Sequence, residues 1–160
     1  MIYSKTSEYA IRALAYLSTQ PKNAVSTFRE VARKTGVPQA YVAKIFQCLV
    51  RSKILGSHRG RVGGFYLKAD PAKLTLIKVI NSIEDIPRSV FTGCVMGLDQ
   101  CSDHQPCPLH YEWVEAKEKM TKRLSCTSIT DVAKLDGRFE AGKKRQPYTL
   151  SKGMRKLFKL

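Results

Sequence analysis

Three cysteines and a histidine stand close together in the second half of the chain, at spacings that suit a metal centre. Cys94, Cys101 and Cys107 fall within 14 residues, and His110 follows the last of them by three residues. Thiolates are soft donors that favour iron–sulfur clusters or zinc over harder cations. The spacings contain no Cys-x-x-Cys pair of the kind common in structural zinc sites. They therefore favour a cluster and leave zinc as the alternative.

The sequence leaves the fourth ligand open. His110 is the local choice, and His104, between two of the cysteines, is a weaker one. Glu8, on the expected first helix, becomes a ligand only if that helix lies against the cysteine loop of a partner subunit. The ordinary alternative for Glu8 is a solvated helix carboxylate.

The remaining thiols have simpler interpretations. Cys48 and Cys126 stand alone, and since free cysteines are often buried, we interpret both as small packing residues. An alternative role for Cys107 and His110 is that of a nucleophile pair in an enzyme. No pattern for a substrate pocket or an oxyanion hole accompanies it, so we expect no enzyme.

The charge balance points to a polyanionic partner. The 160 residues include 28 Lys and Arg against 13 Asp and Glu, a formal net charge of +15. Nucleic acid and anionic membrane are the two classes of partner that such an excess favours. No apolar run approaches the length of a spanning helix, and the first residues lack the pattern of a secretory signal. We therefore expect double-stranded DNA as the partner, no membrane, and a reducing cytoplasm in which disulfides are rare.

The first half of the chain predicts a helix-turn-helix. Apolar spacing predicts a helix over residues 4–17. Thr27 and Glu30 fit a capping box at the start of a second helix, which ends at Gly36. Pro38 opens a third helix, whose buried stripe is formed by Val42, Ile45, Phe46 and Leu49.

A hairpin is expected directly after the third helix. Residues 54–67 predict two short strands around a tip rich in glycine and arginine, which is the wing of a winged helix. The outward face of the third helix and the wing supply the expected DNA contacts to bases and phosphates. These are Gln39, Tyr41, Lys44 and Arg51 on the helix, and Ser57, Arg59 and Arg61 on the wing.

The second half predicts a helix over 75–85, a loop over 87–107 and a long helix over 108–124. The long helix has a bulky stripe and a charged back, which suits dimer pairing. The fold class is mainly α, a winged helix-turn-helix with a long dimerisation helix. We expect a DNA-binding domain over 1–86, the cysteine loop over 87–107, the dimerisation helix and a short following helix over 108–135, and a basic tail over 136–160.

Several of these segments resemble the winged-helix iron–sulfur transcription regulators, the family of the iron–sulfur cluster assembly regulator (IscR-like proteins) and of nitric-oxide-sensitive repressors. The resemblance covers roughly residues 1–135, and the wing is its most specific part. The matching segments are Ser4-Lys5…Glu8-Tyr9-Ala10, Tyr41…Ile45-Phe46…Leu49, Ser57-His58-Arg59-Gly60…Gly63-Gly64-Phe65-Tyr66-Leu67 and Thr127-Ser128-Ile129-Thr130-Asp131-Val132.

The resemblance implies a homodimeric repressor that binds a palindromic operator through the third helix and Arg59. It implies that the three clustered cysteines hold an iron–sulfur cluster, [2Fe–2S] ahead of [4Fe–4S]. His110 matches the histidine ligand of the assembly regulator, while Glu8 stands where other members use a carboxylate. The signal is then redox state, nitric oxide, iron or cluster supply. A cluster-free or zinc-binding, thiol-responsive repressor is the alternative.

The chain departs from the assembly regulator in three ways. Both Glu8 and His110 are present, which leaves the ligand set and the cluster type open. The gap between the first two cysteines is one residue longer. Ala40 and Ala43 stand on the third helix where that regulator has polar side chains, so its operator preference is not transferable.

Overall fold

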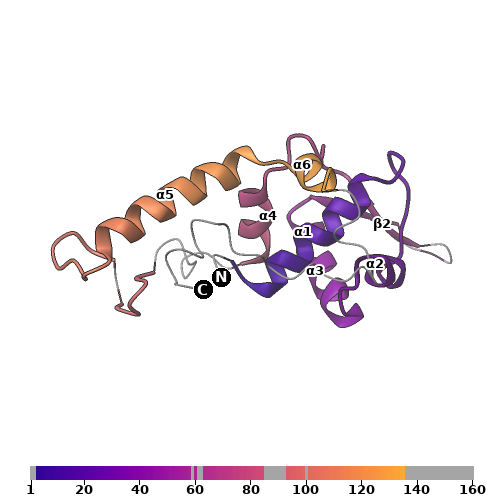
Figure 1. Cartoon of the computed structure of the whole chain (residues 1–160). Helices are drawn as coiled ribbons and strands as arrows, with labels where there is room; N and C mark the ends of the chain where they lie inside the picture. Colours follow the sequence, from indigo (N-terminus) through magenta and orange to yellow (C-terminus); the bar gives the residue numbers. More distant parts are fainter. Residues whose placement is uncertain (1–2, 59, 61–62, 85–92, 100, 136–160) are drawn as a thin grey trace, which may run out of the picture.

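The protein is a helical body with a hairpin at one end and one long helix projecting from the other side (Figure 1). The computed structural model describes residues 3–58, 60, 63–84, 93–99 and 101–135. In chain order the elements are α1 (Lys5–Ser18), α2 (Phe28–Thr35), α3 (Gln39–Arg51), β1 (Leu55–His58), β2 (Gly64–Leu67), α4 (Leu76–Ile83), α5 (His110–Cys126) and α6 (Ile129–Ala133).

Helix α1 is the central element of the body, because it packs against α2, α3, α4 and α6. Its start is fixed by Ser4, whose hydroxyl accepts a hydrogen bond from the backbone N–H of Ser7. Its apolar side chains join the core around Phe46, Ile45 and Leu49 of α3, all of which are fully buried. The expected first helix and the buried stripe of the third are therefore confirmed.

The predicted helix-turn-helix forms with two local differences. Thr27 caps α2 by accepting from Glu30 N at 3.2 Å, but the Glu30 carboxylate does not complete a capping box. It accepts a hydrogen bond from the Tyr16 hydroxyl at 3.2 Å and so ties α2 to α1. Pro38 is the N-cap of α3 rather than its first helical residue, with ψ at 134°. This position still suits proline, since no N–H is needed there.

The wing is an antiparallel pair, with Leu55 opposite Leu67 and His58 opposite Gly64. Phe65 packs its ring against Phe46 at a centroid distance of 4.9 Å, which fixes the hairpin on α3. A third partner, absent from the sequence prediction, is the bridge between Ser26 and Phe65, with both backbone hydrogen bonds at 2.9 Å. Gly64 permits this approach, because a Cβ there would lie 2.8 Å from the Ser26 carbonyl oxygen.

Helix α5 starts and ends two residues later than the predicted 108–124, and it projects from the body (Figure 1). Along its 17 residues only His110 and Leu124 are buried in the described chain. Helix α5 runs from its distal start back to the body, and α6, which follows it, packs on α1. Ser128 and Asp131 form a full capping box at the start of α6.

The mainly helical fold class with a two-stranded wing is confirmed. No helix in the described residues is long and apolar enough to cross a membrane. Arg59, Arg61, residues 87–92 of the expected loop and the basic segment 136–160 lie outside the described residues.

We expect Ser128→Ala to lower the free energy of unfolding by about 1 kcal/mol, because the α6 cap loses its acceptor. Chemical denaturation followed by circular dichroism measures this. Ser52→Ala is the matched control, since its hydroxyl is exposed at the end of α3, and it should change stability by less than about 0.5 kcal/mol. Equal effects of the two substitutions would contradict the role of the cap.

The stability lost in Ser128→Ala should depend on pH. Hydrogen bonds from Ser128, first from its side chain and then from its backbone, lower the pKa of Asp131 to about 2. A carboxyl whose folded pKa is lowered stabilises the fold above its unfolded pKa and loses that contribution as pH falls towards the folded value. The stability difference between wild type and Ser128→Ala should therefore be full at pH 6 and smaller at pH 2.5. A difference that grows on acidification would contradict this.

Candidate metal centre and DNA-binding surface

The segment that carries the three clustered cysteines leads into the end of α5 that lies away from the body (Figure 1). The thiols occur as two contacts rather than one group. Cys94 Sγ is 3.8 Å from Cys107 Sγ, and Cys101 Sγ is 3.5 Å from Nδ1 of His110. All three cysteines are partly buried and none is in a disulfide. The structure thus brings the three sequence-predicted thiols and His110 to one end of one helix.

His110 is the most enclosed of these donors. As the first residue of α5 it is only 3% exposed, and its backbone N–H donates to the Cys107 carbonyl at 2.9 Å. Its second ring nitrogen, Nε2, lies 2.7 Å from Oδ1 of Asp103. The ring therefore spans from a carboxylate on the loop to a cysteine sulfur. His104, the weaker candidate, is exposed, and its backbone N–H donates to the Ser102 hydroxyl.

The loop is held to α5 and contains a hydrogen-bonded turn between the first two cysteines. Trp113 Nε1 donates to the Gly93 carbonyl at 2.9 Å and anchors the segment before Cys94. Gly97 N donates to the Cys94 carbonyl at 3.1 Å, with Gly97 at a φ of 79° that favours glycine. This turn sits between the first two cysteines, so it sets how their thiols approach each other.

The surroundings of Cys94 favour its thiolate. The backbone N–H of Met96 is the main reason that the pKa of the Cys94 thiol lies below its usual value. The backbone of Leu98, the Cys107 thiol and the charge of Lys117 act in the same direction, while desolvation opposes them. A thiolate is the form in which cysteine binds a metal.

Within the described residues, no three His, Cys, Asp or Glu side chains are arranged as a ready-made metal site. The donor chemistry nevertheless fits an iron–sulfur cluster or zinc, since three soft sulfurs and one imidazole come from a segment of 17 residues, 94–110. The Cys94–Cys107 pair and the Cys101–His110 pair do not meet at one point. The loop between Cys94 and Cys107 would have to bring them together.

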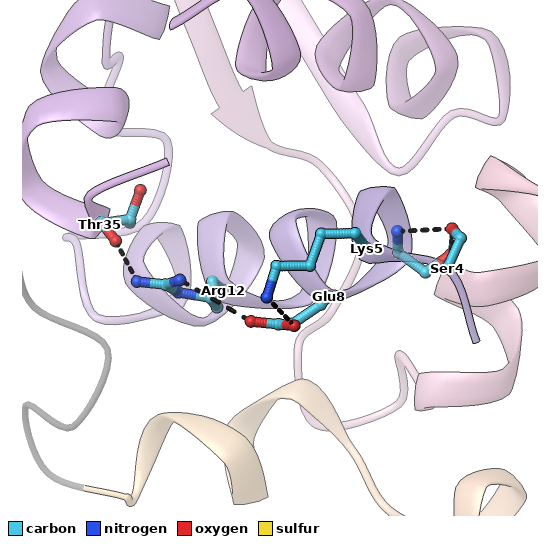
Figure 2. A network of polar contacts seen from close by, with 6 residues as sticks. Ser4, Lys5, Glu8, Arg12 and Thr35 are labelled. Carbon is cyan, nitrogen blue, oxygen red and sulfur yellow. Dashed lines mark hydrogen bonds and ion pairs between the residues drawn. The ribbon is translucent and has the colours of Figure 1, made fainter. Parts of the chain in front are cut away.

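Glu8 lies on α1 of the body, and the cysteine loop lies at the distal end of α5 (Figures 1 and 2). Its carboxylate contacts Lys5 Nζ at 2.6 Å and Arg12 Nη1 at 3.8 Å. Arg12 also donates to the Thr35 carbonyl at the end of α2 (Figure 2). Within one chain Glu8 thus belongs to a network that joins α1 to the turn of the helix-turn-helix.

The described DNA candidates lie on α3 and β1. Gln39, Tyr41, Lys44, Arg51 and Ser57 are all exposed. A groove of about 410 Å³ runs between the end of α3 and the wing, lined by Gln47, Val50, Arg51, Ser57 and Phe65. Tyr41 has a second role, because its ring packs edge-on against Tyr9 of α1 at 5.4 Å. Arg51 and Ser57 both line this groove.

The structure bears on the sequence interpretation of three single residues. Cys126 is exposed at the end of α5, so its assignment as a packing residue is wrong for this chain. Cys48 is half-buried, with its sulfur 3.6 Å from Arg51 Nη2. Asp103 was missed altogether, and the only signal for it was an acid placed between two of the cysteines.

Comparison with known proteins gives a clear family. The model of the Rrf2 family, described as an iron-dependent transcriptional regulator, matches residues 3–135. A relative from Aquifex aeolicus, named as an HTH-type transcriptional regulator, is 30% identical over 138 residues, or 85% of this chain and 94% of that protein. The HTH-type transcriptional regulator IscR of Xenorhabdus nematophila is 23% identical over 134 residues, or 84% of this chain and 80% of that protein.

A solved structure has the same fold. CymR, the global cysteine regulator of B. subtilis, superposes with a TM-score of 0.66 at 18% identity, over 84% of this chain and 98% of CymR. At this identity the likeness concerns the fold alone. It agrees with the winged-helix architecture described above.

The sulfur distances predict which thiols cross-link first. We expect diamide, which takes two electrons and two protons from a thiol pair, to form mainly a Cys94–Cys107 disulfide in metal-free protein, because these sulfurs are already 3.8 Å apart. Peptide mapping by mass spectrometry identifies the pair, and a Cys126→Ser variant controls for links between chains. A dominant cross-link through Cys101 would contradict the observed pairing.

Proposed function

This chain belongs to the Rrf2 family of transcriptional regulators, and we propose that it is a repressor whose DNA binding responds to an iron–sulfur cluster held by Cys94, Cys101 and Cys107. Members of the family are regulators of transcription rather than enzymes. The observation that carries the proposal is the gathering of three thiols and a buried imidazole at the start of α5. The family's description as iron-dependent supports the choice of iron.

The cluster is proposed to be [2Fe–2S] ahead of [4Fe–4S], with His110 as the fourth ligand. When bound, such a cluster supplies a redox-active centre that oxidants or nitric oxide can alter and that depends on iron and cluster supply. His110 is favoured over Glu8 because its Nδ1 already lies beside Cys101. Glu8 would first have to give up its contacts with Lys5 and Arg12.

The protein is proposed to act as a homodimer paired through α5. Among the described residues, nothing fully covers the apolar stripe of this helix before Leu124. Leu109 is 47% exposed, and Trp113 and Met120 are half-buried. A partner helix along α5 would cover this stripe, and the twofold symmetry of the pair would require a palindromic operator. The dimer would also set the spacing between the two α3 helices.

The chain's own residues supply the proposed response. Ligation would draw Cys94, Cys101 and Cys107 together and order the loop that leads into α5. Because α5 packs on α4, and α4 on α1 and α3, a shift of α5 would reach the DNA-reading helix. The population of the DNA-binding arrangement would change with the state of the loop. The proposed setting is the cytoplasm, where reduced thiols persist.

The DNA surface is proposed to combine Gln39, Tyr41, Lys44 and Arg51 of α3 with Ser57 of the wing. Arg59 and Arg61, at the tip of the wing, complete the set but lie outside the described residues. We propose that Lys44 and Arg51 contact phosphates or base edges, and the groove lined by Arg51 and Ser57 suits a DNA backbone. The net charge of +15 supports a polyanionic partner.

A cluster-free or zinc-binding, thiol-responsive repressor is the second candidate. The contact between Cys94 and Cys107 favours it, since these sulfurs are close enough to be oxidised together. The fold shared with the cysteine regulator CymR is compatible with it. The two candidates differ in one respect that is easily measured, which is the inorganic content of the protein.

Anaerobic reconstitution with iron and sulfide should give a coloured protein with visible charge-transfer absorption. Cys107→Ala should lose this absorption because one sulfur ligand is removed, whereas Cys126→Ala should keep it. Iron and sulfide assays on the same samples give the stoichiometry. A colourless wild-type protein holding one zinc per chain would overturn the cluster and support the second candidate.

Lys44→Ala and Arg51→Ala should each weaken DNA binding and lower the slope of log K against log salt by about 1, as expected for the loss of one phosphate contact. Fluorescence anisotropy at several salt concentrations measures both quantities. Lys73→Ala is the control, since Lys73 is exposed in the segment 71–74, whose backbone carbonyls accept hydrogen bonds from the start of α6. An equal loss of affinity in the control would contradict the proposed surface.

A further inference from the structure

We propose that Asp103 is a positioning residue that turns the Nδ1 atom of His110 towards the sulfur donors. The inference rests on the proposed metal centre and adds to it a residue that the sequence did not single out. Its basis is one pair of contacts on opposite sides of the same ring. Nε2 of His110 lies 2.7 Å from Asp103 Oδ1, and Nδ1 lies 3.5 Å from Cys101 Sγ.

The identity of the Nε2 partner selects the tautomer. An ionised carboxylate only accepts hydrogen bonds, so the nitrogen facing Asp103 must carry the proton. In the neutral ring the other nitrogen, Nδ1, then carries the lone pair. A metal ligand must offer a lone pair, and the Asp103 contact leaves that lone pair beside Cys101. Histidines that bind metals very often donate their second N–H to a carboxylate, which fixes the ring and raises its basicity.

The rest of the ring's surroundings restrict it to this orientation. The backbone of His110 is tied to the Cys107 carbonyl at 2.9 Å, so the histidine and the third cysteine move together. Tyr111 packs its ring edge-on at a centroid distance of 5.2 Å. The ring is only 3% exposed, and its two polar contacts with the loop are Asp103 at Nε2 and Cys101 at Nδ1. Asp103 also links the ring to a point two residues after Cys101.

Because Asp103 is exposed, its effect on the orientation of His110 can be measured without an effect on folding. Its side chain is 88% exposed, so truncating it opens no cavity and removes no core contact. Substitutions at such surface positions usually change stability by less than about 0.5 kcal/mol. A change in metal binding after Asp103→Ala is therefore attributable to His110 rather than to a damaged fold. Asp99, an exposed carboxylate in the same loop, provides a matched control for charge.

The first experiment needs no metal. Long-range ¹H–¹⁵N spectra of the reduced, metal-free full chain report the tautomer of each of its three histidines, with His110→Ala giving the assignment. We expect His110 of wild type and of Asp99→Ala to be protonated at Nε2. We expect Asp103→Ala to lose that preference and show a mixture of tautomers. Protonation of wild-type His110 at Nδ1, or an unchanged tautomer in Asp103→Ala, would overturn the proposal.

The second experiment measures the metal centre. Asp103→Ala should lower iron affinity by about 10- to 100-fold, as found for carboxylates that orient ligating histidines, while Asp99→Ala should leave it unchanged. In a His110→Ala background the added Asp103→Ala substitution should have no further effect, because Asp103 acts through that ring. The same loss in both backgrounds would overturn the positioning role.

The two experiments distinguish a failure of the proposed function from a failure of the positioning role. If wild type assembles no cluster but His110 is still held as the Nε2–H tautomer by Asp103, the proposed function is wrong and the positioning contact stands. If the cluster assembles and the tautomer does not depend on Asp103, the positioning role is wrong and the proposed function stands. Thermal unfolding of Asp103→Ala, expected to match wild type, checks that the fold is intact in both cases.

Discussion

Helix α5 is buried at its two ends and little between them, and this constraint governs how the cysteines can influence the rest of the protein. His110 begins the helix beneath the cysteine loop, and Leu124 enters the core near its other end. Helix α3, which we propose contacts DNA, lies in the body, beyond the end of α5 that joins it (Figure 1). A change at the thiols would therefore reach α3 along α5 and α4, or through a partner chain lying on the exposed side of α5. Dimer formation would thus be part of the sensing mechanism.

The cysteine loop has its own set of contacts, and the proposed ligation would have to rearrange them. Cys94 pairs with Cys107, and Cys101 pairs with the His110–Asp103 unit. Bringing all three thiols to one centre would remove the proton of the Cys94–Cys107 hydrogen bond and move Cys101 towards these two sulfurs, while His110 would keep its contact with Asp103. Loops with two alternative sets of contacts of this kind are suited to act as switches, because a small local change selects between them.

Local chemistry made most of the fold predictable. Ser4, Thr27 and Ser128 mark helix starts by capping, and Gly36 ends α2, so these boundaries follow from single residues. The bridge from Ser26 to Phe65 was not predictable, because one paired residue leaves no periodic pattern. For the site, soft donors at close spacing identified the three cysteines and His110. Asp103 escaped notice because an exposed acid in a loop looks like any solvated charge until its distance to the ring is known.

The most direct test of the account is the affinity of one preparation for its operator before and after the cluster is removed, under strict exclusion of oxygen. The operator is first obtained by selection from random DNA. The account predicts that the cluster-loaded and cluster-free dimers differ in affinity by about 5- to 150-fold, the usual range of coupling between two sites. Equal affinity of the two forms would contradict it.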